Sequence, residues 1–246
     1  MTKIKNAIIL AAGRGSRMKH LTDNMPKCMM QINNKTIIRR TIEILKYKNI
    51  NNIIVVTGYK SDVLTNYIRS FDNSIIFINN SAWAITNSIY SMFLVSKYLH
   101  DTLVIDSDIY INNPDCILTE VEFSGYSAVK TYNSKEWNLH VDNEHIIDYV
   151  HTDYSNANVL TDNCLPIIDI SYWVNKDSKF IDSTIKSLIL TATSKDVYNQ
   201  YWDEVPLRYL LHALSLKRYD INEDDAIEFD TEEELNDIRS KICLVD

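Results

Sequence analysis

Short runs of consecutive apolar residues alternate, over the first 110 residues, with longer segments whose apolar residues recur every three or four positions. The runs have the length of buried strands, and they cover residues 7–12, 53–57, 75–78 and 103–106. The segments between them have the periodicity of amphipathic helices, around residues 37–45, 63–68 and 89–99. This alternation predicts an α/β fold with a doubly wound, mostly parallel sheet, helices on both faces, and ligands at the carboxyl ends of the strands.

The stretch 131–166 departs from this pattern, because it is polar, rich in aromatic residues and only weakly periodic. We interpret it as a small insertion that lies over the site and binds part of the ligand. No repeat or low-complexity linker divides the chain. With 246 residues and 46% hydrophobic content, we expect a single domain over residues 1–246, including this insertion.

The charge and the absence of targeting segments narrow the class of protein. A formal net charge of −8 and a pI near 5.3 argue against nucleic acid or an anionic membrane as partner. No apolar run approaches the roughly 18 residues of a membrane helix, and no leader peptide opens the chain, so we expect a cytoplasmic protein. The four cysteines and six histidines lack metal-ligand spacing. A homo-oligomer is compatible with the sequence, which leaves the oligomeric state open.

Two glycines follow the first apolar run, in the stretch AIILAAGRGSRM over residues 7–18. Gly13 and Gly15 permit tight backbone conformations that turn successive N–H groups toward one point, which suits a polyphosphate, and Arg17 and Lys27 could add charge. A turn that needs glycine for geometry alone is the simpler interpretation. A dinucleotide fingerprint would need a glycine in place of Met18 and an acidic residue near residues 57–59, and a Walker A loop is absent from the chain.

The longer string LAAGRGSRMKHLTDNMPKCM, residues 10–29, resembles the signature L-A-A-G-x-G-x-R…P-K of nucleotidyltransferases that activate sugar phosphates and phosphoalcohols. The resemblance implies a Rossmann-like nucleotidyltransferase fold and a bound nucleoside triphosphate. It assigns nucleotide binding to Leu10, Ala11, Ala12, Gly13, Gly15, Arg17 and Lys27, of which Arg17 and Lys27 are also catalytic. In that family, an oxygen of the acceptor's phosphate attacks the α-phosphorus and pyrophosphate leaves.

Such a reaction depends on positioning and charge neutralisation, so we expect Mg²⁺ held by carboxylates. The string LVIDSDIY places Asp106 and Asp108 at the end of an apolar strand, where the family carries a metal-binding aspartate, and Asp108 is the better match. The string AIEFDTEEE offers Asp230 as a second ligand. Alternatively, its acidic residues Glu228, Glu232 and Glu233 form a solvated helix start.

The string TNSIYSMFLV, residues 86–95, resembles the N-x-x-Y-S-L pattern of bacterial CTP:phosphocholine cytidylyltransferases and their relatives. Further matches follow in order at VIDSDIY, KEW, ISYW and YWD. The resemblance implies CTP as donor and a small phosphorylated or phosphonylated amine as acceptor. Aromatic faces with a nearby carboxylate bind an ammonium well, and the candidates are Tyr90, Trp137, Trp173, Tyr201, Trp202 and Asp203.

Among these, Tyr90 and Trp173 lie in apolar patterns typical of a core. Trp137 and Trp202 lie in polar surroundings, so we expect them to bind the acceptor, with Asp203 as charge partner. Asp169 replaces the family's glycine before ISYW and would add a second negative charge to that pocket. This departure leaves phosphocholine, phosphoethanolamine, 2-aminoethylphosphonate and an amino-acid phosphate open as acceptors. A sugar-1-phosphate nucleotidylyltransferase and a non-catalytic nucleotide-binding domain are the alternatives.

Overall fold

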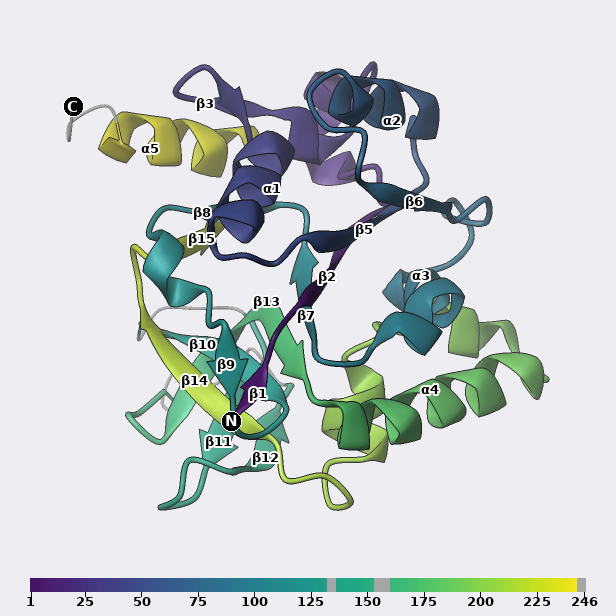
Figure 1. Ribbon diagram of the computed structural model, residues 1–246, viewed down its shortest axis with the longest axis vertical. Coiled ribbons are helices and arrows are strands. Elements are labelled where there is room, and N and C mark those ends of the chain that lie inside the picture. Colours follow the sequence, from purple (N-terminus) through teal and green to yellow (C-terminus); the bar gives the residue numbers. More distant parts are fainter. Residues whose placement is uncertain (132–135, 153–159, 243–246) are drawn as a thin grey trace.

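Four parallel strands form the centre of the computed structural model, which describes residues 1–131, 136–152 and 160–242 of the chain (Figure 1). Their order in the sheet is β7–β2–β5–β6. The bounds are β2 (Asn6–Ala11), β5 (Asn52–Thr57), β6 (Ile76–Asn79) and β7 (Thr102–Asp106). The four strands predicted from the apolar runs, and their parallel arrangement, are confirmed.

Helices cover both faces of this sheet, as the doubly wound prediction requires (Figure 1). One face packs against α1 (Ile37–Tyr47) and α2 (Ser61–Arg69), and the other against α3 (Ser88–Val95) and α4 (Asn175–Leu190). The sheet thus separates two hydrophobic cores, the first beneath α1 and α2 and the second beneath α3 and α4. Within β2, Ile9 lies in the first core, and its neighbours Ile8 and Leu10 lie in the second. Successive residues of a strand point to opposite faces, so an unbroken apolar run is what a strand covered on both sides needs.

Antiparallel strands extend the sheet beyond β7. The long strand β13 (Cys164–Trp173) pairs with β7, with β11 (Asn138–Val141) and with β10 (Gly125–Lys130). The outer strands are β12 (Ile147–His151) beside β11, and β14 (Lys217–Asn222) parallel to β10. The described part of the expected insertion 131–166 therefore contributes strands to the main sheet, whereas residues 132–135 and 153–159 of that stretch lie outside the described residues.

Among the residues that the structure describes, three strand pairs stand apart from the main sheet. They are β1 (Thr2–Lys3) with β9 (Glu120–Val121), β3 (Gln31–Ile32) with β4 (Lys35–Thr36), and β8 (Ile109–Ile111) with β15 (Ala226–Glu228). Helix α5 (Glu232–Ile242) follows β15 and packs Leu235 and Ile238 onto Met18 and Phe229. The pairing of β15 with β8 brings residues 226–228 beside the segment that follows β7. In the part of the chain that the structure describes, no helix is long and apolar enough to span a bilayer.

Candidate active site

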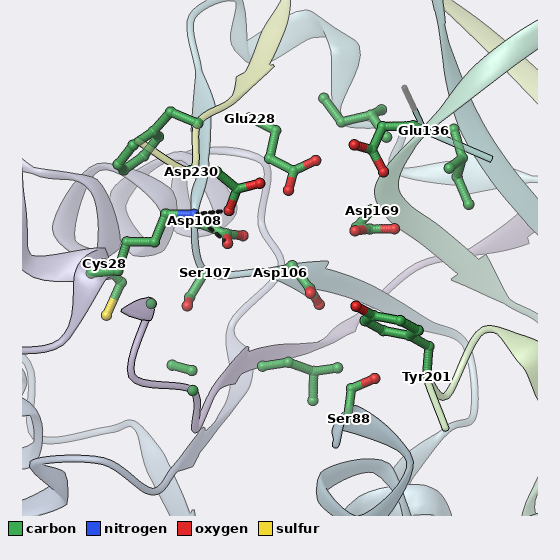
Figure 2. A pocket seen from close by; sticks show the side chains of 18 of the residues that line it. Cys28, Ser88, Asp106, Ser107, Asp108, Glu136, Asp169, Tyr201, Glu228 and Asp230 are labelled. Carbon is green, nitrogen blue, oxygen red and sulfur yellow. Dashed lines mark hydrogen bonds and ion pairs between the residues drawn. The ribbon is translucent and has the colours of Figure 1, made fainter. Parts of the chain in front are cut away.

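A cavity of about 1010 Å³ lies at the carboxyl ends of the central strands. The segment that follows β2 lines one side of it, and residues 80–91, which follow β6 and include the first turn of α3, line another. Further parts of the wall come from β13, from the end of β7 and the segment after it, from residues 136–137 and 201–203, and from β15 with the turn into α5. Figure 2 shows carboxylates from several of these elements directed into the same space. The cavity therefore lies where a doubly wound sheet is predicted to bind its ligands, at the carboxyl ends of the strands.

The two glycines of the loop differ in what they do. Gly15 has φ +66°, and a Cβ atom there would lie 2.9 Å from the Cβ of Lys27, so both its conformation and its surroundings require glycine. Gly13 has no positive φ, and an added Cβ would meet nothing within 4 Å. The structure therefore shows a conformational requirement for glycine at Gly15, whereas Gly13 leaves space at the cavity. Leu10, Ala11 and Ala12 also line the cavity.

Lys27 lies between two carboxylates that are far from it in the sequence. Its Nζ donates to Asp108 Oδ2 and to Asp230 Oδ1, each at 2.8 Å, and its side chain passes under Gly15. Burial opposes the charge on this amine, but Asp108 and Asp230 outweigh burial and raise the pKa of Lys27. The exposed side chain of Arg17 forms a further ion pair with Asp230. The structure thus brings Arg17, Lys27, Asp108 and Asp230 together.

Three acidic residues form a cluster with the geometry of a metal site. One carboxylate oxygen each from Asp108, Glu228 and Asp230 lie within 4.8 Å of one another. Figure 2 shows these three side chains directed into the same part of the cavity. Burial, followed by the charge of Asp108, raises the pKa of Glu228 to about 8. Asp106 is not part of this cluster.

Glu228 was not among the expected ligands, although the sequence contains a signal for it. It lies two residues before Asp230 in a short alternating run, and such residues point to the same side of a strand. The acidic residues that follow do begin a helix. Thr231 and Glu234 form a capping box, in which Glu234 accepts from the backbone N–H of Thr231 and also from that of Asp230.

The aromatic residues expected to hold the acceptor divide between the cavity and the core. Trp137 lines the cavity, and its ring meets that of Tyr201 edge to face at 6.4 Å. Trp202 is only 2% exposed and packs against Tyr126 and Trp173. The expectation that Trp202 lies in polar surroundings and binds the acceptor is wrong, because its backbone turns the indole into the core while the adjacent Tyr201, 56% exposed, faces the cavity.

Tyr90 and Trp173 also belong to the second core. Tyr90 packs against Phe93 and Tyr198, and it does not line the cavity, so its inclusion among acceptor residues is not supported. The ring of Trp173 is fully buried, as its apolar context predicts.

Asp169 and Asp203, both expected at the acceptor, line the cavity. The Tyr126 hydroxyl donates to Asp203 at 2.9 Å, but burial outweighs this bond and raises the pKa of Asp203 to about 7. Burial and the nearby Asp106 raise the pKa of Asp169 well above its usual range. Glu136 also lines the cavity, and burial is the first cause of its raised pKa. Glu136 is the middle residue of the KEW string, of which only Trp137 was expected at the site.

Comparison with known proteins agrees with this geometry. Residues 7–121 match the MobA-like NTP transferase domain. The chain is 31% identical over 240 residues to a choline-phosphate cytidylyltransferase of Haemophilus influenzae, covering 96% of this chain and 97% of the relative. It is 43% identical over 112 residues to a CTP:phosphoglutamine cytidylyltransferase of Campylobacter jejuni, covering 46% of this chain and 44% of that one.

Among solved structures, the CTP:phosphocholine cytidylyltransferase of Streptococcus pneumoniae superposes with a TM-score of 0.83. The two sequences are 25% identical, and the match covers 96% of this chain and 98% of the other. Because the matches to the Haemophilus and Streptococcus enzymes span nearly the whole of both proteins, the chain belongs to the nucleotidyltransferase family that includes these enzymes.

Proposed function

We propose that this enzyme transfers CMP from CTP to a small phosphorylated or phosphonylated amine and releases pyrophosphate. One observation carries the proposal. A single cavity combines a glycine loop with cationic side chains, a triad of carboxylates, and a further group of acidic side chains beside the rings of Trp137 and Tyr201. The names of the relatives in Haemophilus, Campylobacter and Streptococcus support CTP as donor and a phosphorylated amine as acceptor.

At the loop, the backbone around Gly13 and Gly15 would bind the triphosphate, with Arg17 and Lys27 against its phosphates. In the structure these two cations are paired with Asp108 and Asp230. Binding of CTP would therefore require them to exchange carboxylate partners for phosphate oxygens. The exchange keeps each cation paired, which limits the cost of desolvating it.

The triad of Asp108, Glu228 and Asp230 fits Mg²⁺, because it offers hard oxygen ligands from three side chains that already converge. The ammonium of Lys27, held by two of the three, supports the view that this point accepts positive charge. A bound Mg²⁺ would offset the negative charge of the phosphates and orient them.

In the proposed reaction, an oxygen of the acceptor's phosphate or phosphonate forms a bond to the α-phosphorus of CTP. The bond from that phosphorus to the bridging oxygen breaks, and the electron pair leaves on pyrophosphate. Arg17 and Lys27 would stabilise the charge that builds on these oxygens. Such in-line transfer needs no covalent protein nucleophile, so positioning and electrostatics account for the catalysis.

At the opposite end of the cavity, the amine of the acceptor would lie against Trp137 and Tyr201. Aromatic faces attract a cation by on the order of 0.5–2 kcal/mol each. Asp169 and Asp203 would supply the countercharge there. A neutral sugar has no charge to satisfy these carboxylates, which favours the amine over a sugar phosphate.

Pyrophosphate release from CTP and Mg²⁺ tests the proposal directly. The acceptors to compare are phosphocholine, phosphoethanolamine, 2-aminoethylphosphonate, an amino-acid phosphate and glucose-1-phosphate. We expect turnover with at least one amine, none with the sugar, and loss of turnover in Asp108→Asn. Turnover with the sugar alone would contradict the acceptor assignment, and CTP binding without turnover of any acceptor would contradict the catalytic one.

A further inference from the structure

Two aspartates face each other across adjacent strands at the acceptor end of the cavity. The antiparallel register of β13 and β7 pairs Ile170 with Ile105, so the next residues along, Asp169 and Asp106, lie opposite each other. Residues directly opposite in this way point to the same face of the sheet, with Cβ atoms about 4.5–5.5 Å apart. Figure 2 shows both carboxylates beside Tyr201, directed into the cavity.

One oxygen of this pair lacks the hydrogen-bond partner that a buried carboxylate oxygen normally has. Asp106 Oδ1 is buried and has no hydrogen-bond partner among the described residues. Asp203, the third acid at this end, differs because it accepts the hydroxyl of Tyr126. A buried acceptor without a donor costs about 1–3 kcal/mol, so this oxygen is suited to a donor that arrives with a ligand.

A second metal ion does not account for the pair. Among the described residues, the triad of Asp108, Glu228 and Asp230 is the one group of three acids whose oxygens approach within 4.8 Å of one another. Asp106, Asp169 and Asp203 do not converge in this way. In the described part of the cavity wall, the two cationic side chains are Arg17 and Lys27, and both lie at the triad or the loop. The ion pairs of these two cations are with Asp108 and Asp230, so neither cation forms an ion pair with Asp106 or Asp169, although the charge of Lys27 acts on Asp106 from a distance.

We propose that Asp106 and Asp169 select an acceptor whose cationic nitrogen carries N–H groups, a primary ammonium in preference to a quaternary one. This inference rests on the proposed cytidylyltransferase function. A primary ammonium brings three donors and can bond Asp106 Oδ1 together with Asp169. A trimethylammonium has the same charge but no donor, so it would cover these carboxylates with methyl groups, exclude water and leave the buried oxygen unpaired.

A series of acceptors that differ only in N-methylation tests the proposal. Phosphoethanolamine, its N-methyl and N,N-dimethyl derivatives, and phosphocholine have the same cationic charge and lose one N–H donor at each step. We expect kcat/KM, measured by pyrophosphate release with CTP and Mg²⁺, to fall along the series, by roughly tenfold or more between the ends. Equal or higher kcat/KM for phosphocholine would overturn the inference while leaving the proposed function intact.

Substitutions test whether Asp106 and Asp169 cause this preference for acceptors with N–H groups. Asp169→Asn and Asp106→Asn should each reduce the ratio of kcat/KM for phosphoethanolamine to that for phosphocholine. Glu223→Gln is the matched control, since Glu223 also lines the cavity but follows β14, which pairs with neither β7 nor β13, and it should leave the ratio unchanged. CTP binding and thermal unfolding would show that each variant is folded. An unchanged ratio in both folded aspartate variants would overturn the assignment. No turnover with any of the four amines, with 2-aminoethylphosphonate or with an amino-acid phosphate would overturn the proposed function and the inference together.

Discussion

Lys27 is the residue that connects the loop to the acidic triad, because its amine is bonded to two of the three carboxylates. It is 5% exposed and also lies over the ring of Phe229 at 4.8 Å. Few lysines are buried to this extent unless their charge is paired. The pairing explains how a cation can be held ready in the cavity before any phosphate arrives.

Replacing Lys27 by methionine should lower turnover far more than it changes the fold. The thioether fills similar volume but cannot stabilise charge on the phosphates, so we expect kcat to fall by roughly 10²–10³. The ligand-free variant should also unfold at a lower temperature, because Asp108 and Asp230 lose their shared partner, and Mg²⁺ should restore part of this loss. Lys35→Met, which removes an exposed pair with Glu43, is the control. Near-normal turnover in Lys27→Met would remove Lys27 from the mechanism.

The two loop glycines should respond differently to alanine. Gly15→Ala forces a side chain into the left-handed region and against Lys27, and we expect it to lower the free energy of unfolding by about 1–2 kcal/mol and to reduce turnover. Gly13→Ala should leave the free energy of unfolding unchanged, since a Cβ there meets nothing. Urea unfolding of both variants measures this difference. Equal losses would show that the left-handed φ of Gly15 is not what requires glycine there.

At the scale of elements, the junction of β15 with α5 determines where two of the triad's carboxylates lie. β15 pairs with β8, which places Glu228 opposite Ile109, one residue after Asp108. Asp230 follows in the turn, and its backbone N–H is held by Glu234 in the first turn of α5. The capping box of α5 therefore positions a proposed metal ligand as well as beginning the helix.

Removing this cap should affect stability and metal binding together. Thr231→Ala deletes the bond to the N–H of Glu234, and we expect a loss of about 1 kcal/mol in the free energy of unfolding. Because the turn that holds Asp230 loosens, the Mg²⁺ concentration for half-maximal turnover should rise. Ser194→Ala removes the cap of a distant 3-10 turn, and it should change stability without changing this concentration. A Thr231→Ala enzyme with unaltered Mg²⁺ dependence would show that the cap does not position Asp230.

At the scale of the whole molecule, buried acids make the ligand-free protein sensitive to pH. Burial raises the pKa of Asp203 to about 7 and that of Glu228 to about 8, whereas both titrate near 4 in an unfolded chain. Between about pH 4 and pH 8 the folded state therefore binds more protons than the unfolded state, and the stability that these groups contribute is lost as the pH rises through 7 and 8. Carboxyls with lowered pKa, such as Asp72 and Asp225, titrate below this window.

We accordingly expect the unfolding temperature of the ligand-free protein to fall between pH 5.5 and pH 8.5. Asp203→Asn should reduce this slope, because an amide cannot titrate. Asp196→Asn, at a surface turn, should leave it unchanged. Differential scanning calorimetry across this range measures the slope, and an unfolding temperature that rises with pH would contradict the charge balance derived for the cavity.

The sequence by itself determined the elements and much of the site's chemistry. Local patterns indicate burial in the unbroken apolar runs of β2, β5, β6 and β7 and in the helical periods between them. Such local patterns can be recognised without knowledge of the fold. The loop from Leu10 to Lys27 and the aspartates Asp108 and Asp230 could likewise be found from motif and spacing. The resemblance to cytidylyltransferases rested on the order of such strings along the chain.

The tertiary structure alone decided which side chains meet and which way each one points. Lys27 reaches partners 81 and 203 residues away, and such distant pairings have no local period to predict them. Trp202 and Tyr201 are neighbours with similar polar surroundings, yet packing against Trp173 takes one ring into the core and leaves the other in the cavity. The opposition of Asp106 and Asp169 depends on the register of β13 against β7. A hydrophobic pattern records how deeply a residue is buried, whereas contacts between distant elements arise only when the sheet and its helices have assembled.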